Sequence, residues 1–331
     1  MVKVKKLLTL SSMAIRVIKI KFFNKKLPLF ASVDITNNCN LRCNHCYWWI
    51  NHNAHRELTP DEWRLIIRKK IIEKGVSAIS LTGGEPLLRP DVIEAIIDEM
   101  RWRNVSIVTN GTIPLINFGV GYFVSIDGPE KIHDMIRGAG TYRKIKKNII
   151  SHPEIKTVIN MTINRLNYKS VEEVCEEWYP YAQAITFQFH TPFAYNDELW
   201  LEYGKERNET INRLLKLKSK IPDFIANTSK QLDLFRNSHW TPYCPGWLFI
   251  NLDSNGFEKQ LCVISNTSDA GVKPICERCG IGCYAGAFAG LFLADSEWFR
   301  MFSVGRRIRP VIINEKIIEK YEAVTPLLEN P

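Results

Sequence analysis

Eight of the nine cysteines fall into two groups whose spacing is typical of metal ligands. The first group is the short segment Cys39-x3-Cys43-x2-Cys46. The second group consists of Cys244, Cys262, Cys276, Cys279 and Cys283. Thiolates are the usual ligands of iron–sulfur clusters, and close spacing lets one loop wrap one face of a cluster. The cysteine pattern therefore predicts metal or redox chemistry rather than disulfide bonds.

The first group is compatible with two kinds of metal site. Three cysteines on a four-iron cluster leave one iron open to a ligand that is not protein. A structural zinc ion prefers four ligands, and His52 or His55 could supply the fourth. Spacing favours the iron–sulfur cluster, because no further cysteine lies nearby in the sequence.

The second group has too many cysteines within forty residues to be explained by packing. Cys276, Cys279 and Cys283 lie on a loop that enters a predicted helix, and Cys244 or Cys262, or both in turn, would complete four-sulfur coordination. The run Asp-Ser-Asn-Gly at 253–256 predicts a hairpin turn that brings Cys262 to the other cysteines. A zinc knuckle is the alternative.

The elements that must position these residues alternate between short β-branched runs and longer amphipathic stretches. Strands are predicted at 31–35, 78–82, 105–109, 122–126, 157–163 and 185–190, and helices at 60–74, 90–101, 141–150 and 170–178. A helix over 198–220 and a polar linker to residue 238 follow. This order predicts an α/β fold, a partial (β/α)6 TIM-type barrel with a small cysteine-rich C-terminal module.

Polar residues and glycines follow each predicted strand. In strand order they are the Cys39 loop, Gly83-Gly84-Glu85, Asn110, Ser125 with Asp127, Asn164, and His190. The carboxyl ends of parallel strands meet at one rim of a barrel, where such folds carry their chemistry. We therefore expect these residues to share one site.

These motifs, in this order, resemble the radical S-adenosylmethionine (SAM) superfamily over about residues 29–200. The resemblance implies that Cys39, Cys43 and Cys46 hold a [4Fe–4S] cluster whose open iron is chelated by SAM. It implies an enzyme that cleaves SAM reductively to a 5′-deoxyadenosyl radical, which abstracts hydrogen from an unactivated carbon or adds to it. An external one-electron donor such as ferredoxin or flavodoxin would be its partner.

The same resemblance implies SAM-binding roles around the rim. His45 occupies the place of a residue that packs near the adenine, and Gly83-Gly84-Glu85 matches a Gly-Gly-Glu element that receives the SAM ammonium group. Ser125 and Arg137 match positions that hold the ribose or the SAM carboxylate, for which an arginine fork is well suited. The predicted cofactor-binding set is completed by Asn110, Asp127 and Asn164.

The C-terminal module resembles the auxiliary-cluster extension called SPASM, or its shorter twitch form. It has too few cysteines for two auxiliary clusters, so the resemblance implies a single second [4Fe–4S] cluster on four of the five. The predicted organisation is an N-terminal segment at 1–28, a radical SAM core at 29–235, an auxiliary module at 236–300 and a tail at 301–331.

A looser resemblance links the segments around Cys244 and Cys276 to radical SAM proteins that make adenosylhopane and to lipid-modifying enzymes of archaea. It implies a membrane lipid or isoprenoid as the preferred substrate. One competing interpretation is modification of a peptide or partner protein, which is the commonest use of SPASM modules. The other is a zinc-bound scaffold at the membrane without enzymatic activity.

Residues 1–28 form a basic amphipathic segment. Its apolar positions recur at helical spacing and comprise Val4, Leu7, Leu8, Ser11, Ala14, Ile15, Ile18 and Phe22, with Lys5, Ser12, Arg16 and Lys19 opposite them. Such a helix fits an anionic membrane surface. It fits equally well across the open barrel, where it would help to roof the site.

Composition and charge exclude several classes of protein. An apolar content of 45% with 24% charged residues is that of a globular chain. Eight of the 44 Lys and Arg residues lie within 1–33, which leaves 36 against 35 Asp and Glu. A nearly neutral body counts against nucleic acid as a partner. No secretory signal or membrane span is predicted, so we expect a cytoplasmic protein that contacts the inner membrane face peripherally.

Overall fold

The computed structural model describes residues 2–50, 56–265, 271–298, 311–313 and 316–318. Side chains are described for 11–50, 56–265 and 271–298. His52 and His55, the candidate fourth ligands of a zinc site, lie outside the described residues. So does most of the predicted tail, apart from the short strands β8 (Val311–Ile313) and β9 (Lys316–Ile318).

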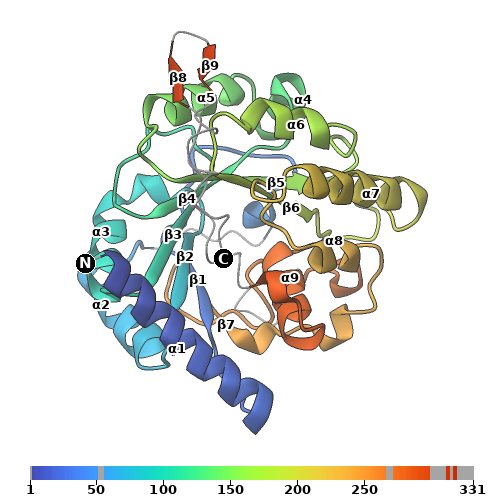
Figure 1. Cartoon of the computed structure of the whole chain (residues 1–331). Coiled ribbons are helices and arrows are strands. Elements are labelled where there is room, and N and C mark those ends of the chain that lie inside the picture. The colour runs from blue at the N-terminus through green and yellow to red at the C-terminus, as the bar shows by residue number, and fades with distance from the viewer. Residues whose placement is uncertain (1, 51–55, 266–270, 299–310, 314–315, 319–331) are drawn as a thin grey trace, which may run out of the picture.

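A seven-stranded parallel sheet forms the body of the molecule, in the order β6-β5-β4-β3-β2-β1-β7. Its strands are β1 (Phe30–Asp34), β2 (Ala78–Thr82), β3 (Asn104–Thr109), β4 (Gly121–Ser125), β5 (Thr157–Ile163), β6 (Ala184–Phe189) and β7 (Phe249–Leu252). Figure 1 shows the sheet curved into an open barrel with helices around its outside. The predicted α/β partial barrel is confirmed, with one strand more than expected.

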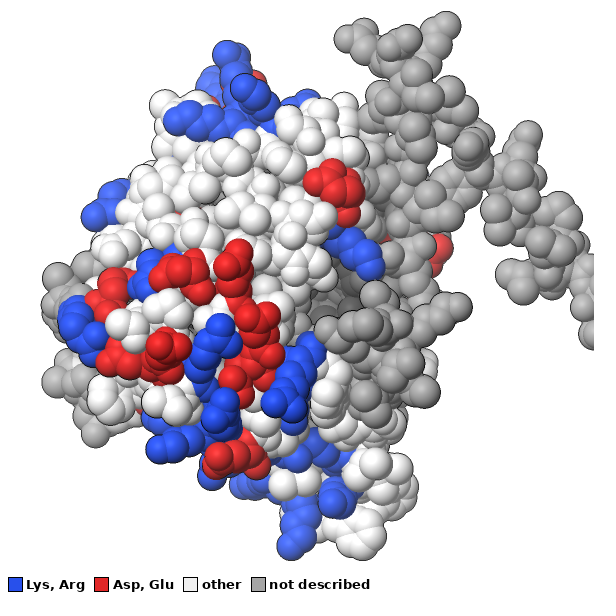
Figure 2. Space-filling view, turned by 90° about the vertical axis from the view of Figure 1, so that its left-hand side faces the viewer, with Lys and Arg blue, Asp and Glu red and all other residues white. Residues whose placement is uncertain are grey.

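The helices around the sheet are α2 (Pro60–Ile67), α3 (Pro90–Met100), α4 (Glu130–Arg137), α5 (Thr141–Ser151), α6 (Val171–Trp178) and α7 (Lys205–Lys220). Helix α2 begins as predicted, because the Thr59 side chain and Glu62 form a capping box, and it continues as a π-helical turn over Arg68–Ile72. Ion pairs such as Arg64–Asp98 join α2 to α3, and Figure 2 shows acidic and basic side chains interleaved on that side of the molecule.

Two predictions for the segment after β6 were wrong. Helix α7 begins at Lys205 rather than at 198, because Gly204 precedes it with a φ of 122° that most residues avoid. The predicted polar linker contains the short helix α8 (Ser229–Leu234), which is capped by Thr228 and Gln231. Both capping side chains are buried, so their polarity serves the capping box rather than solvent exposure.

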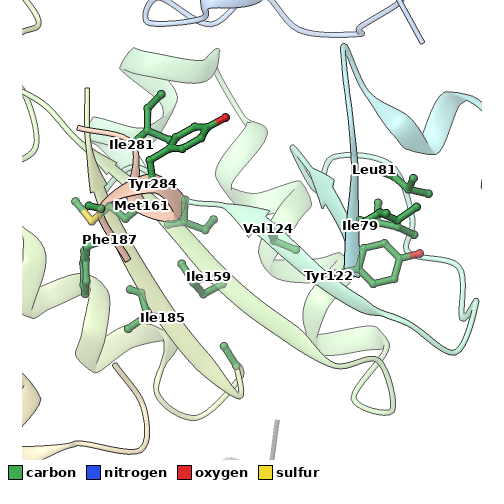
Figure 3. Close-up of a cluster of buried hydrophobic side chains, with 14 of the residues drawn as sticks. Ile79, Leu81, Tyr122, Val124, Ile159, Met161, Ile185, Phe187, Ile281 and Tyr284 are labelled. Atoms are coloured by element: carbon green, nitrogen blue, oxygen red, sulfur yellow. The ribbon is translucent and has the colours of Figure 1, made fainter. Parts of the chain in front are cut away.

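The two faces of the sheet differ in polarity because side chains alternate along a strand. On one face, buried apolar residues pack together with the helices (Figure 3), including Ile79, Leu81, Tyr122, Val124, Ile159, Met161, Ile185 and Phe187. The intervening positions carry hydroxyls that bond across strands, as between Ser32 and Thr82 (3.1 Å) and between Ser80 and Ser106 (2.9 Å). The barrel therefore has an apolar outer face and a polar inner face.

The C-terminal module extends this barrel. Strand β7 pairs in parallel with β1, from Phe30 opposite Phe249 to Val33 opposite Leu252. The chain then turns as predicted at 253–256, and the Lys259 amide donates to the Asn251 carbonyl at 2.8 Å. Helix α9 (Gly282–Phe292) contacts β6 and α8. The module thus flanks both edges of the open sheet, through β7 on one side and α9 on the other (Figure 1).

The N-terminal helix α1 (Val2–Phe23) packs at the amino ends of β1 and β2, away from the cysteine-bearing rim. Met13 and Val17 are buried there, and the Arg16 guanidinium donates to the carbonyls of Pro28 (3.0 Å) and Lys74 (2.8 Å). The prediction that this helix could roof the site was therefore wrong. Among the described helices, none is both long enough and apolar enough to cross a membrane.

Candidate active site

The loop that carries Cys39, Cys43 and Cys46 follows β1 at the carboxyl rim and leans on the end of β2. The Gly84 amide donates to the Thr36 carbonyl (3.0 Å), and the Glu85 amide donates to the Asn38 carbonyl (2.8 Å). A Cβ atom on Gly84 would overlap the Asn38 carbonyl oxygen. The glycine is thus needed here because two protein backbones approach each other closely.

The other side of the cysteine loop is held by the end of α4. The Asn44 amide donates to the Ile136 carbonyl (2.8 Å), and its side-chain amide donates to the Met135 carbonyl (3.0 Å). The Cys43 sulfur lies 4.0 Å from the Arg137 carbonyl oxygen. The end of α4, nearly a hundred residues further along the chain, therefore holds this side of the cysteine loop in place.

Glu85 joins the Gly-Gly-Glu element to the end of β3. Its carboxylate is fully buried and accepts hydrogen bonds from the Leu87 amide (3.0 Å), the Thr109 hydroxyl (2.7 Å) and the Asn110 amide (2.8 Å). Burial raises the pKa of this carboxyl group above its ordinary value. The Asn110 side-chain amide reaches within 4.0 Å of the Cys39 sulfur. A further role for Glu85 with the SAM ammonium group stays a prediction.

Asp127 is a buried carboxylate at the rim that contacts several charged and polar groups. Its carboxylate accepts from the Arg137 Nε (2.5 Å) and the Thr162 amide (2.9 Å), and it lies 3.5 Å from the His45 Nε2. Burial acts to raise its pKa, but Arg137 and His45 outweigh burial and the net shift is downward. Asp127 is therefore an anion that orients a cation beside the cysteine loop.

Several polar groups at this rim have no partner among the described residues. The His45 Nδ1 and the Asn164 side-chain nitrogen are buried without a hydrogen bond. Burial lowers the pKa of His45 to about 4, so its ring is neutral at pH 7. The Arg137 guanidinium, held by Asp127 through its Nε, and the buried Ser125 hydroxyl lie at the same rim. This donor set fits the carboxylate and ribose of SAM, and its assignment stays a prediction.

The structure brings the five C-terminal cysteines together. Cys244 and Cys262 each act electrostatically on both Cys279 and Cys283, and Cys276 acts on Cys244 and Cys262. Burial raises the pKa of Cys262 to about 11 and that of Cys244 to about 12. In the described chain, no three His, Cys, Asp or Glu side chains already surround the position of a single metal ion.

The loop of Cys279 is tied to the end of β6. The Phe189 amide donates to the Gly280 carbonyl (2.9 Å), and the Gly280 amide donates to the Thr191 hydroxyl (2.8 Å). His190 lies at the same strand end, where its Nε2 is 2.8 Å from the Asp197 carboxylate. Its ring meets the His45 ring edge to face at 6.3 Å. The sixth strand thus reaches both cysteine groups.

Sequence reasoning missed a buried ion pair between Asp34, at the end of β1, and Lys259, on the hairpin after β7. Asp34 also accepts from the Thr82 hydroxyl (2.7 Å), and the Lys259 ammonium group lies 6.0 Å from the ring centres of Tyr47 and Trp48. A charged residue inside the predicted strand 31–35 was the available signal for Asp34. Nothing in the sequence pointed to Lys259.

A known protein family matches the part of the chain that forms this rim. Residues 33–177 match the family model of the Radical SAM superfamily. The matched segment, 33–177, carries the radical SAM signature that the cysteine motif predicts, and SAM with a [4Fe–4S] cluster are the cofactors of that superfamily.

Two curated relatives cover different shares of the chain. The sporulation killing factor maturation protein SkfB of Bacillus subtilis is 31% identical over 163 residues, which are 46% of this chain and 40% of SkfB. The chain thus spans less than half the length of that relative. Fe-coproporphyrin III synthase of Methanosarcina barkeri is 28% identical over 323 residues, which are 88% of this chain and 74% of that protein.

Among solved structures, SuiB of Streptococcus suis, bound to its precursor peptide SuiA, superimposes with a TM-score of 0.59. The match covers 78% of this chain and 65% of SuiB at 17% identity, so it bears on the fold alone. It extends well beyond the residues matched by the family model.

We predict that Gly84→Ala lowers the iron bound at the Cys39 loop by up to about four atoms per chain, because the new methyl group must displace Asn38. Iron and sulfide content after anaerobic reconstitution measures the effect. Gly121→Ala is the matched control, since its nearest neighbour beyond the adjoining residues lies 4.0 Å away and its φ is not positive. Equal iron content in the two variants would contradict the prediction.

Proposed function

We propose that the protein cleaves SAM reductively at a [4Fe–4S] cluster held by Cys39, Cys43 and Cys46. The supporting observation is the cysteine loop fixed at the barrel rim between Gly84 and the end of α4. When bound, the cluster supplies the electron that breaks a sulfur–carbon bond of SAM and releases a 5′-deoxyadenosyl radical. An external one-electron donor such as ferredoxin or flavodoxin reduces the protein beforehand.

The residues of the chain bind and orient SAM in this proposal. Arg137 holds the SAM carboxylate through its terminal nitrogens, while Asp127 keeps the guanidinium oriented from the other side. His45, which is neutral, lies beside the adenine. Ser125 and Asn164 donate to the ribose. The rim thereby fixes one position for the radical relative to the substrate.

We also propose a second [4Fe–4S] cluster on four of the five C-terminal cysteines. Contacts between their neighbours support it: the Val263 amide, next to Cys262, donates to the Tyr284 hydroxyl, next to Cys283 (3.0 Å), and the turn before Cys244 contacts the turn Cys276–Arg278. Thiols whose pKa is raised by burial are poor anions by themselves, and metal binding removes their protons. The cluster would bind the substrate or move an electron.

The preferred substrate in our proposal is a peptide. SkfB is named as a maturation protein, and SuiB has been solved with a precursor peptide. The lipid or isoprenoid substrate is the second candidate. The exposed face of α1 favours that second candidate, because it suits a membrane surface.

The described part of α1 exposes apolar side chains beside a cluster of lysines. The apolar ones are Ile15 (54% exposed), Ile18 (50%), Phe22 (78%) and Phe23 (65%). The exposed lysines are Lys19, Lys21, Lys25 and Lys26. The helix packs on the barrel through its other face and leaves this surface free. We propose that it makes peripheral contact with an anionic membrane.

We predict that the reduced, reconstituted protein converts SAM to 5′-deoxyadenosine and that Cys43→Ala abolishes this conversion, because the cluster loses a ligand. Chromatography of the nucleoside measures it. Cys175→Ala is the control, since Cys175 is buried in α6 outside both cysteine groups. Intact SAM in wild-type protein with its full iron content would contradict the proposal.

The same assay separates the two substrate classes. Addition of a host peptide fraction below about 10 kDa should raise 5′-deoxyadenosine formation above the level without substrate, whereas a total lipid extract should leave it unchanged. Stimulation by the lipid extract alone would favour the second candidate instead.

We predict that the protein floats with phosphatidylglycerol vesicles but not with phosphatidylcholine vesicles. The triple substitution Ile15→Ser, Ile18→Ser and Phe22→Ser should reduce binding at least tenfold, because it removes the apolar surface that enters the headgroup region. Added salt should weaken wild-type binding as well.

A matched control for this experiment is the triple substitution Leu65→Ser, Ile150→Ser and Leu166→Ser. These side chains are exposed to a similar degree (55%, 46% and 40%) but lie on other parts of the surface. Equal loss of binding in both triple variants, or no binding by the wild type, would contradict a membrane contact through α1.

A further inference from the structure

Arg207 is a buried cation to which the described chain offers no carboxylate. Its side chain, in the first turn of α7, is 0% exposed. The Nε donates to the Phe235 carbonyl and one terminal nitrogen to the Leu201 carbonyl, both at 2.7 Å. The other terminal nitrogen is buried without a partner. An unpaired buried charge is costly, so its presence calls for a negative group nearby.

Two aromatic rings hold the guanidinium group between them. Its central carbon lies 4.2 Å from the Phe189 ring centre and 4.6 Å from that of Tyr203. Ring faces attract a cation, but they carry no net charge and cannot balance it. The buried site therefore remains positively charged overall.

Both aromatic residues also contact the loop of the C-terminal cysteines, Tyr203 through its side chain and Phe189 through its backbone. The Tyr203 hydroxyl donates to the Glu277 carbonyl at 2.8 Å. The Phe189 amide donates to the Gly280 carbonyl at 2.9 Å, and a Cβ atom on that glycine would overlap the Phe189 backbone. The side chain of Tyr203 thus lies between Arg207 and the segment Cys276–Gly280, although some seventy residues separate Arg207 from that segment in sequence.

Cys279, on the same loop, can supply the missing counter-charge once it is bound to a metal. Burial lowers the pKa of Arg207 to about 10, and the groups that act in the opposite direction are Tyr203 and Cys279. Burial raises the pKa of Tyr203, so that phenol is neutral at pH 7. A metal-bound thiolate at Cys279 supplies the negative charge that the site lacks.

We propose that Arg207 is a positioning residue that balances the negative charge of the auxiliary cluster bound through Cys279 and raises the reduction potential of that cluster. Reduction adds an electron, and a buried cation nearby stabilises the added charge because few water molecules screen it. This inference rests on the proposed auxiliary cluster. Arg278 also lies near the loop, but it stacks on Trp200 and is only partly buried, so solvent screens its charge.

The test uses the full chain with Cys39, Cys43 and Cys46 all changed to Ala, so that iron is bound only by the C-terminal module. In this background, Arg207→Gln should shift the midpoint potential of the cluster to a more negative value. A redox titration monitored by electron paramagnetic resonance measures this potential. Arg207→Lys retains the charge and should stay close to the unsubstituted background.

Arg213→Gln is the matched control. Arg213 is also on α7 and donates to the carbonyls of Tyr168 and Lys169, but it is paired with Glu172 on α6. Its loss should lower thermal stability and leave the potential unchanged. A purely structural role for Arg207 predicts the same result for both variants.

Iron content separates the two ways in which the experiment can fail. Full iron with an unchanged potential in Arg207→Gln would overturn the inference and leave the auxiliary cluster standing. No iron in the background protein would overturn the auxiliary cluster itself. Where Arg207→Gln does not fold, Arg207→Lys decides: a background-like potential supports the inference, and a clearly more negative one overturns it.

Discussion

The contact between the backbones of Gly84 and Asn38 is the constraint on which the rest of the site depends. It presses the cysteine loop after β1 against the end of β2, at a distance that no side chain larger than hydrogen allows. Glu85 continues the connection by binding the end of β3 with its buried carboxylate. The ends of β1, β2 and β3 are thereby joined. Asp127, which follows β4, accepts a hydrogen bond from the Thr162 amide and so connects the end of β4 to β5. A loop held in this way can present three sulfurs in a fixed arrangement.

The C-terminal module completes the barrel, and its charged residues lie between the two cysteine groups. Lys259 follows the seventh strand and reaches across to Asp34 at the end of the first. A buried ion pair adds little net stability, but removal of one partner is costly, so the pair fixes the hairpin relative to β1. Lys259, three residues before Cys262, also lies 6.0 Å from the ring centre of Tyr47, which follows Cys46. The hairpin after β7 therefore connects the surroundings of the two cysteine groups.

The sequence predicted what depends on local pattern. Alternating β-branched runs placed six strands correctly to within a residue at most ends, and the order of motifs placed Asn110, Asp127 and Arg137 near the cysteine loop. The seventh strand escaped detection because Phe249–Leu252 is only four residues long and pairs with a strand more than two hundred residues away. Lys259 and Arg207 escaped for a related reason: a charged residue in a polar segment gives no sign of burial until distant elements pack over it. The packing face of α1 was equally hidden, since Met13, Arg16 and Val17 contact the barrel while the apolar stripe remains outside.

The central claim is that each cysteine group holds its own iron–sulfur cluster. Iron and sulfide content after anaerobic reconstitution tests it most directly, in wild-type protein and in the variant with Cys39, Cys43 and Cys46 replaced by Ala. The account predicts about eight irons per chain in the wild type and about four in the variant. An iron content that the triple substitution leaves unchanged, or a wild-type protein that binds no iron, would contradict it.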